Sequence, residues 1–205
     1  MAIQVLHSCR SKKGPTIAFS GPPGGGKTTY AKRLAQELGL EYYSAGTIFR
    51  EYAHERGVSL EELNQLAIKD PRIDYEIDSR TYRIGCRGNV VLEGHLVAWV
   101  ISSIADVKIY ITAPLETRVE RIARREGRNR DEVLRETIFR EYMHRQRFLM
   151  LYGIDIANLQ IFNLVLDTGS LSAEEAYSLI RSYVCAVLLR KGYRLDKCAG
   201  LDNQR

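Results

Sequence analysis

Short runs of strand length alternate with longer segments of helical periodicity along most of the chain. Apolar runs of this kind occupy residues 16–20, 90–92, 107–111 and 164–166, and residues 41–43 are a further strand candidate. Unbroken apolar strands are typical of parallel sheets covered on both faces, because neither side of the strand meets water. The pattern therefore predicts an α/β fold: a five-stranded parallel sheet flanked by helices, with ligands at the carboxyl ends of its strands.

Capping residues mark the ends of the helices between these strands. Gly39 has the position of a C-cap, and Ser59 and Ser172 each precede a glutamate by three residues, which is the capping-box pattern. Asp70-Pro71 and Pro114 are further helix starts, because proline fits the first helical turn. The first expected helix ends near residue 38. The others span about residues 44–56, 59–69, 70–86, 114–126, 129–152 and 172–190.

The length of 205 residues suits one compact domain with inserted segments. We expect this domain to cover residues 15–190, between a polar extension (residues 1–14) and a polar tail (residues 191–205). The helical stretches at about 44–88 and 120–150 are expected to be mobile insertions near the ligand site.

No part of the sequence predicts a membrane segment. The longest apolar run, residues 96–105, contains two serines and is too short to span a bilayer. The first 14 residues lack the apolar core of a signal peptide. We therefore expect a cytoplasmic protein that does not bind membranes, and we expect it to be a monomer.

The four cysteines, Cys9, Cys86, Cys185 and Cys198, are 77, 99 and 13 residues apart. These intervals match neither a zinc site nor a redox pair. We expect reduced thiols. A Cys185–Cys198 disulfide is the alternative if the source is a hyperthermophile, since disulfides occur in the intracellular proteins of such organisms.

Residues 21–28 carry the strongest chemical signal in the chain. They read Gly-Pro-Pro-Gly-Gly-Gly-Lys-Thr, the pattern of phosphate-binding loops, and they lie between a strand and a helix as that pattern requires. Glycines let successive N–H groups point into one concavity, to which the helix N-terminus adds a positive dipole. We expect ATP with Mg²⁺ there, with Lys27 on the β- and γ-phosphates and the Thr28 hydroxyl on the metal. The expected ATP-binding residues of this loop are Gly21, Pro22, Pro23, Gly24, Gly25, Gly26, Lys27, Thr28 and Thr29.

Glu93 directly follows the apolar run at residues 90–92. In phosphate-loop proteins a second acidic group for Mg²⁺ is expected at such a strand end. The alternative is a carboxylate that simply faces solvent. Because the loop makes a metal necessary, we expect Glu93 to hold Mg²⁺ through a water molecule.

From Arg118 to Arg147 the chain carries ten arginines, six acidic residues and no lysine. Arg121, Arg125 and Arg128 share one helix face, and the first two have no acidic residue four positions away. Like charges at this spacing repel, and a triphosphate between them would turn the repulsion into binding. Arg118 and Arg147 also lack a helical acidic partner. We expect this group to bind phosphate, with a solvated helix face as the alternative.

Further candidates lie near the expected carboxyl ends of the strands. Ser44 opens a helix, and Arg50 follows on the side facing the strand ends, where its guanidinium could fork onto a second phosphate. Asp78 lies too far along its helix for the helix dipole to explain it, so it is a candidate for hydrogen-bonding a base or sugar. His95 follows Glu93-Gly94 and would point into the same cleft, with a structural histidine as the alternative.

Together these motifs resemble the archaeal-type cytidylate kinases, a branch of the nucleoside monophosphate kinases. The resemblance covers about residues 16–190. Besides the phosphate loop it rests on five blocks in order, which are residues 42–50 (YYSAGTIFR), 89–94 (NVVLEG), 113–118 (APLETR), 121–127 (RIARREG) and 151–155 (LYGID).

The resemblance implies transfer of the ATP γ-phosphate to CMP or dCMP, on a phosphate-loop fold with an acceptor-binding region and a lid. It implies catalytic roles for Lys27 and for two lid arginines, Arg121 and Arg125. It also implies that Arg118 and Asp167 contribute to the ATP site, Asp167 in a loop that borders the adenine. The expected acceptor-binding residues are Ser44, Arg50, Asp78, His95, Arg140 and Arg147.

His95 departs from the family pattern, which has an arginine after the pair of acidic residue and glycine. If that arginine holds the acceptor phosphate, a histidine holds it less strongly and in a pH-dependent way. Since a charge-assisted contact is worth about 1.5–3 kcal/mol, we expect weaker or altered acceptor binding.

Two other functions are compatible with the sequence. One is a kinase for another small acceptor, such as AMP or UMP, and the other is an RNA-associated ATPase or polynucleotide kinase, which the arginines suggest. Aromatic residues are not interleaved with the arginines as base stacking would require. We therefore expect small nucleotides (ATP, CMP and dCMP) as partners, and no nucleic acid.

Overall fold

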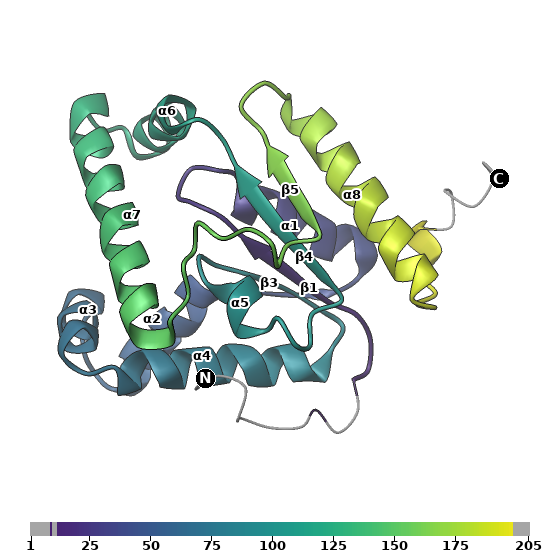
Figure 1. Ribbon diagram of the computed structural model, residues 1–205, viewed down its shortest axis with the longest axis horizontal. Coiled ribbons are helices and arrows are strands. Elements are labelled where there is room, and N and C mark those ends of the chain that lie inside the picture. The colour runs from purple at the N-terminus through teal and green to yellow at the C-terminus, as the bar shows by residue number, and fades with distance from the viewer. Residues whose placement is uncertain (1–8, 10–11, 199–205) are drawn as a thin grey trace.

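A single parallel sheet forms the centre of the molecule (Figure 1). The computed structural model describes residue 9 and residues 12–198, without the side chains of residues 61 and 64. The order of the five strands is β2-β3-β1-β4-β5, and all neighbours are parallel, so the predicted sheet is confirmed. The strands are β1 (Thr16–Ser20), β2 (Glu41–Ser44), β3 (Val90–Glu93), β4 (Val107–Thr112) and β5 (Leu164–Asp167).

The helices predicted from capping residues are all present. Gly39 ends the first one in the left-handed conformation, and Ser59 and Ser172 form complete capping boxes. A short additional helix, α5, was not predicted, because its four residues lie in an apolar run without a polar face. The helices are α1 (Lys27–Leu38), α2 (Ala45–Glu55), α3 (Leu60–Lys69), α4 (Arg72–Arg87), α5 (Val97–Val100), α6 (Leu115–Glu126), α7 (Arg130–Tyr152) and α8 (Ala173–Arg190).

Alternate residues of the central strand face two different cores. Ile17 and Phe19 of β1 are fully buried in the cluster with α1 and α8, whereas Ala18 belongs to the cluster with α5 on the other face. Burying a side chain of this size stabilises the fold by about 1.5–3 kcal/mol. The sheet is therefore fixed from both sides, as its apolar strands predict.

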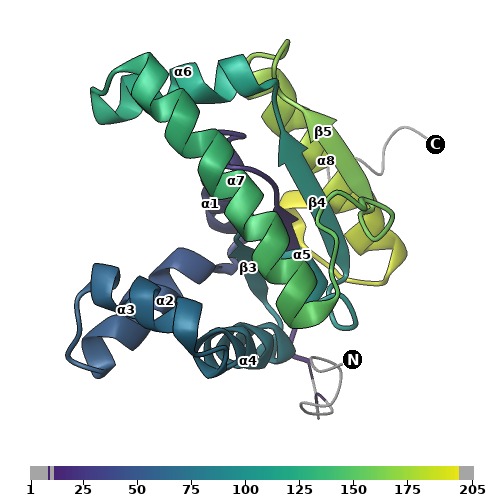
Figure 2. The same cartoon turned by 60° about the vertical axis from the view of Figure 1, so that its left-hand side comes forward.

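Two groups of helices outside the sheet have small cores of their own. Ile48, Leu63 and Ile77 pack together between α2, α3 and α4, and Val119 and Val133 pack between α6 and α7. In Figure 2 these two groups project from the same side of the sheet, with α7 running from α6 toward α4. They include most of residues 44–88 and 120–150, whose role as mobile insertions stays a prediction.

The register of the sheet brings functional candidates to one edge. Glu93 pairs with Ser44 on one side and with Phe19 on the other, one residue before the end of β1. Thr112 pairs with Asp167 in the same way. The carboxyl ends of all five strands thus meet where the loop after β1 begins.

The described residues of the extension and the tail meet at the opposite edge, around Asp106. The Asp106 carboxylate accepts hydrogen bonds from the Thr16 N–H (2.8 Å) and the Tyr193 hydroxyl (3.2 Å). It also forms ion pairs with Lys12 and Lys191. Both ends of the domain are therefore anchored away from the candidate site.

Disulfides join these ends to the domain, and the expectation of reduced thiols is wrong. Cys9 is bonded to Cys86 at the end of α4, and Cys185 of α8 is bonded to Cys198. The second bond is the alternative that the sequence analysis kept. The first could not be predicted, because only the path of the extension brings residues 77 positions apart together.

Removing either disulfide is expected to destabilise the protein. The effect should be larger for Cys9–Cys86, because this bond closes the longer loop. In the chain-entropy model, Cys185→Ser lowers the free energy of unfolding by about 3 kcal/mol and Cys86→Ser by about 4.5 kcal/mol. Chemical denaturation of both variants and of the reduced wild type measures this. Equal midpoints for wild type with and without reductant would contradict the prediction.

Within the described residues, no helix is both long and apolar enough to cross a lipid bilayer.

Candidate active site

The loop between β1 and α1 has the backbone of an anion cradle. Gly24 and Gly26 have φ angles of 77° and 99°, in the left-handed region that favours glycine. Helix α1 begins at Lys27, and no side chain caps its first N–H groups. These groups and the helix dipole are therefore available to a phosphate, as the sequence predicts.

The cradle is tightly supported from behind. A Cβ atom on Gly21 would lie 2.0 Å from the carbonyl oxygen of Ile111, and one on Gly24 would lie 2.6 Å from that of Arg118. The loop is thus wedged between the end of β4 and the start of α6. Its shape depends on both elements.

Lys27 is a nearly buried cation at the centre of this loop. Its side chain is 8 % exposed, and Nζ donates a hydrogen bond to the carbonyl oxygen of Pro22 at 2.8 Å. Burial lowers the pKa of Lys27 to about 8, and the nearby Glu93 only partly opposes this effect. Within the described residues Lys27 has no ion-pair partner, so a bound anion would supply the missing counter-charge.

Glu93, Thr28 and Tyr42 form a polar group beside the loop. Both hydroxyls donate to Glu93 Oε1, Thr28 at 3.2 Å and Tyr42 at 3.0 Å. Glu93 is 8 % exposed and has no cationic partner in ion-pair contact among the described residues. Burial, followed by the Glu93 carboxylate, raises the pKa of Tyr42, which keeps it a neutral donor.

This group fits Mg²⁺ as the sequence expects. An almost buried carboxylate next to a hydroxyl at the phosphate loop provides the hard oxygen donors that Mg²⁺ prefers. The described residues contain no cluster of three or more histidine, cysteine or acidic side chains that could hold a metal alone. The remaining ligands would have to be phosphate oxygens and water. Tyr42 was not singled out as a site residue in the sequence. It lies two residues before Ser44 on β2, so the two side chains share one face of the sheet.

Arg121 is held at the far side of the loop by Thr168. Its guanidinium donates to the Thr168 hydroxyl (2.9 Å) and carbonyl (2.8 Å), and the Thr168 hydroxyl also contacts the Gly25 carbonyl. Asp167 is exposed and accepts a hydrogen bond from the Gly169 N–H. The fully buried Thr168 therefore connects α6 to the loop, a role that the motif alone did not reveal.

Two other arginines of α6, Arg118 and Arg125, have carboxylate partners. Arg125 pairs with Glu126, which also pairs with Arg128, so the stripe expected to repel is partly neutralised. The Arg118 guanidinium lies against Glu141 of α7. Sequence spacing could not show the Arg118–Glu141 pair, because it joins two helices.

Arg147 lies in the contact between α7 and the α3–α4 pair. Its guanidinium pairs with Asp74 and donates to the carbonyl oxygen of Ala67. Arg140, two turns earlier on α7, is exposed and has no ion-pair partner among the described residues. It is close enough to Lys27 to lower the pKa of that lysine. Of the two expected α7 arginines, Arg140 is therefore the one free to bind phosphate.

Three of the acceptor-side candidates, Ser44, Arg50 and Asp78, lie on β2, α2 and α4. Ser44 Oγ caps α2 by accepting from the Thr47 N–H (2.9 Å), and exposed Arg50 donates to the Thr47 hydroxyl (2.9 Å). Asp78 of α4 accepts a hydrogen bond from the Tyr152 hydroxyl of α7. Burial raises the pKa of Asp78 to about 7. Asp78 is thus part of the α4–α7 contact.

Asp78→Asn is expected to stabilise the protein in a pH-dependent way. A carboxyl whose pKa rises from 3.8 to about 7 on folding costs the folded state little near pH 4, and this cost grows as the pH rises until it is fully present above pH 7. The gain from asparagine should therefore be small at pH 4 and reach at most about 4 kcal/mol at pH 8. Thermal unfolding of both proteins at the two pH values measures this. The same gain at pH 4 as at pH 8 would contradict the assigned environment.

His95 contacts the loop itself. Its Nδ1 lies 3.1 Å from the carbonyl oxygen of Gly21, and its ring centroid lies 4.7 Å from that of His144 on α7. Burial, followed by the charge of Lys27, lowers the pKa of His95 well below its usual value. His95 is therefore neutral near pH 7, and Nδ1–H donates to Gly21. A neutral imidazole does not supply the positive charge that an arginine at this position would offer an acceptor phosphate.

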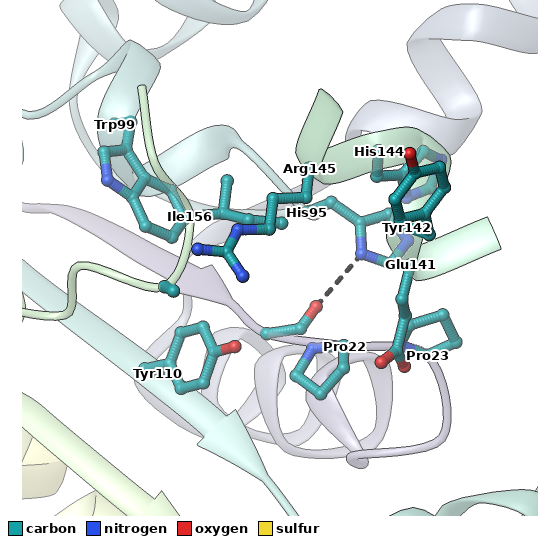
Figure 3. Close-up of a pocket in the computed structure, with 12 residues that line it drawn as sticks. Pro22, Pro23, His95, Trp99, Tyr110, Glu141, Tyr142, His144, Arg145 and Ile156 are labelled. Atoms are coloured by element: carbon teal, nitrogen blue, oxygen red, sulfur yellow. Dashed lines mark hydrogen bonds between the residues drawn. The ribbon is translucent and has the colours of Figure 1, made fainter. Parts of the chain in front are cut away.

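A cavity of about 340 Å³ lies beside the loop, under α7. Figure 3 shows its walls: Trp99 and Tyr110 on one side, and His95, Glu141 and Tyr142 on the other. The Arg145 side chain extends between them and pairs with Asp155. The cavity therefore lies between the phosphate loop and this turn of α7.

Comparison with known proteins identifies the family. A sequence model of the AAA domain matches residues 20–139, which include the phosphate loop. The cytidylate kinase of Staphylothermus marinus is 55 % identical over 168 residues, covering 82 % of this chain and 95 % of its own. That of Aeropyrum pernix is 53 % identical over 162 residues, covering 79 % and 94 %. The chain belongs to the cytidylate kinase family.

Solved structures agree on the fold of this cytidylate kinase family member. A shikimate kinase from Acinetobacter baumannii, solved with shikimate, has a TM-score of 0.55 at 18 % identity and covers 85 % of this chain and 95 % of its own. An uncharacterized protein from Eubacterium ventriosum has a TM-score of 0.62 at 18 % identity, covering 83 % and 98 %. At these identities the likeness shows the fold alone, which is that of phosphate-loop kinases. The resemblance inferred from the sequence motifs is thus confirmed, and the protein is an ATP-dependent phosphotransferase.

Proposed function

We propose that this protein transfers the γ-phosphate of ATP to CMP or dCMP, giving ADP and CDP or dCDP. One observation carries the proposal: over about four-fifths of the chain, slightly more than half of the residues are identical to those of cytidylate kinases. We also expect the enzyme to act as a monomer in the cytoplasm, on soluble nucleotides.

The donor site is formed by the phosphate loop and the end of β5. The N–H groups of residues 24–29 surround the β- and γ-phosphates, and Lys27 leaves the Pro22 carbonyl to contact them. Thr28, with Glu93 through water, would hold Mg²⁺, which when bound neutralises part of the charge on the phosphates. Asp167 and its neighbours border the adenine.

The acceptor site lies between α2, α4 and α7. Arg50 is exposed beside the carboxyl ends of β2 and β3, where it can fork onto the acceptor phosphate. Ser44, His95 and Asp78 line the approach, and Arg140 reaches in from α7. Arg147 supports this site through its pair with Asp74.

Transfer depends on positioning and charge, because phosphoryl transfer requires little covalent chemistry from the protein. The two substrates meet in line between the phosphate loop and α2. Closure of the lid, residues 120–150, over the acceptor region, residues 44–88, brings Arg121 and Arg125 to the transferred group and excludes water. Lys27 and these arginines then stabilise its negative charge.

A coupled assay with ATP, Mg²⁺ and each nucleoside monophosphate tests the proposal. We expect ADP formation with CMP and dCMP that exceeds the rate with AMP or UMP. Preference for AMP or UMP would favour the alternative small-molecule kinase, and no turnover with CMP or dCMP would refute the proposal.

The same screen should include RNA. Six of the ten arginines between Arg118 and Arg147 pair with carboxylates in the structure, which leaves little free positive charge for a nucleic-acid backbone. We expect no tight RNA binding. Binding that falls steeply with salt, without monophosphate turnover, would support an RNA-associated enzyme instead.

A further inference from the structure

Arg118 joins three segments of the chain that meet behind the phosphate loop. Its Nε donates to the carbonyl oxygen of Ala113 at the end of β4 (2.9 Å), and its Nη1 donates to that of Pro23 in the loop (3.2 Å). The guanidinium also pairs with Glu141 of α7. The side chain is 8 % exposed, so its donors have little access to other partners.

Glu141 completes this arrangement from α7, 23 residues away in the sequence. Its side chain is 32 % exposed and lines the cavity beside Pro22 and Pro23 (Figure 3). The contact therefore lies where a lid helix passes the phosphate loop.

A second contact fixes the same turn of α7. The His144 ring lies against that of His95, which in turn contacts the carbonyl oxygen of Gly21. The turn from residue 140 to residue 145 is thus seated on the loop at two points. Arg140, which has no ion-pair partner among the described residues, is adjacent to Glu141 in this turn.

We propose that Glu141 and Arg118 form a positioning pair that seats α7 on the phosphate-binding loop. Arg118 then acts through Glu141 and Pro23 and does not contact ATP. A guanidinium that already serves two carbonyls and a carboxylate could fork onto a phosphate only by leaving one of them, which would leave a buried group unpaired. This proposal rests on the proposed function, because the geometry it protects is that of Arg140 and the phosphate loop.

Two substitutions of Glu141 separate position from charge. Glu141→Gln keeps the length and an oxygen that accepts from Arg118, but removes the charge. Glu141→Asp keeps the charge but is shorter by one methylene and cannot reach. We expect aspartate to lower kcat with CMP about ten- to a hundredfold with little change in KM for ATP, and glutamine to retain most activity.

Two further variants serve as matched tests: one shortens another glutamate of α7, and the other replaces the guanidinium of Arg118. Glu136→Asp shortens a glutamate of α7 whose partner, Arg128, is exposed, and should leave kcat unchanged. Arg118→Lys should lower kcat without weakening binding of a non-hydrolysable ATP analogue, measured by calorimetry. Combining Arg118→Lys with Glu141→Asp should lower kcat little further, because each substitution already removes the same contact between Arg118 and Glu141.

Hydrogen exchange of residues 24–27 and 140–145 tests the Arg118–Glu141 pair in the absence of CMP. We expect faster exchange in both segments for Glu141→Asp and wild-type exchange for Glu141→Gln. Unchanged exchange in Glu141→Asp, or weaker ATP-analogue binding as the main effect of Arg118→Lys, would overturn the positioning role. Absence of CMP phosphorylation by the wild type would instead refute the proposed function, and the exchange result would still decide the pair.

Discussion

Lys27→Met is expected to lower kcat for phosphate transfer by about two to three orders of magnitude. The nearly buried ammonium group is the central positive charge of the phosphate loop, and its loss removes charge stabilisation from the transferred group. Methionine keeps the packing volume without the charge. Steady-state assays with saturating ATP and CMP measure the effect.

The fold should survive this substitution. Burial lowers the pKa of Lys27 to about 8, so the folded protein bears a cost for the charged lysine that is fully present below pH 8 and fades as the pH rises toward 10.5. At pH 7 the variant should therefore have a Tm no lower than wild type. A large fall in Tm, or activity within threefold of wild type, would contradict the role assigned to Lys27.

Arg50→Ala is expected to raise KM for CMP by about tenfold to a hundredfold, with a smaller effect on KM for ATP. A charge-assisted contact to the acceptor phosphate is worth about 1.5–3 kcal/mol, which corresponds to this range. Arg50 is free to make it, since its present partner is the neutral Thr47 hydroxyl.

Arg72→Ala provides the matched control for Arg50. Arg72 opens α4 in the same group of helices, is 88 % exposed and pairs with Asp70. It should leave both KM values unchanged. Equal effects of the two substitutions, or an unchanged KM for CMP in Arg50→Ala, would remove Arg50 from the acceptor site.

The sheet and most helices could be predicted because their signals are local. Apolar runs such as residues 16–20 have no polar face, and capping boxes such as that of Ser59 lie within one turn of the helix they start. The phosphate loop is equally local, since its glycines and Lys27 are consecutive. The helix α5 was missed because four apolar residues carry no periodicity.

The contacts between distant elements could not be predicted in the same way. Arg118 and Arg147 lack acidic partners at helical spacing, yet each meets a carboxylate from another helix, Glu141 and Asp74 respectively. The Cys9–Cys86 bond likewise depends on the path of the extension. Such pairs follow from tertiary packing, which leaves no trace in spacing along one chain.

Part of the site was hidden for the same reason. Thr168 follows Asp167 in the loop that the resemblance places beside the adenine and carries no signal of its own, whereas the fold buries it between Arg121 and the Gly25 carbonyl. The sequence could not set the protonation of His95, whereas in the fold burial, followed by the charge of Lys27, lowers its pKa and keeps it neutral.

A crystal structure with Mg²⁺, a non-hydrolysable ATP analogue and CMP tests the central claim most directly. The account predicts the triphosphate in the loop of residues 21–28, with Lys27 Nζ moved from the Pro22 carbonyl to the β- and γ-phosphate oxygens, and the CMP phosphate at Arg50. A triphosphate bound away from this loop, or a CMP phosphate beyond the reach of Arg50, would contradict it.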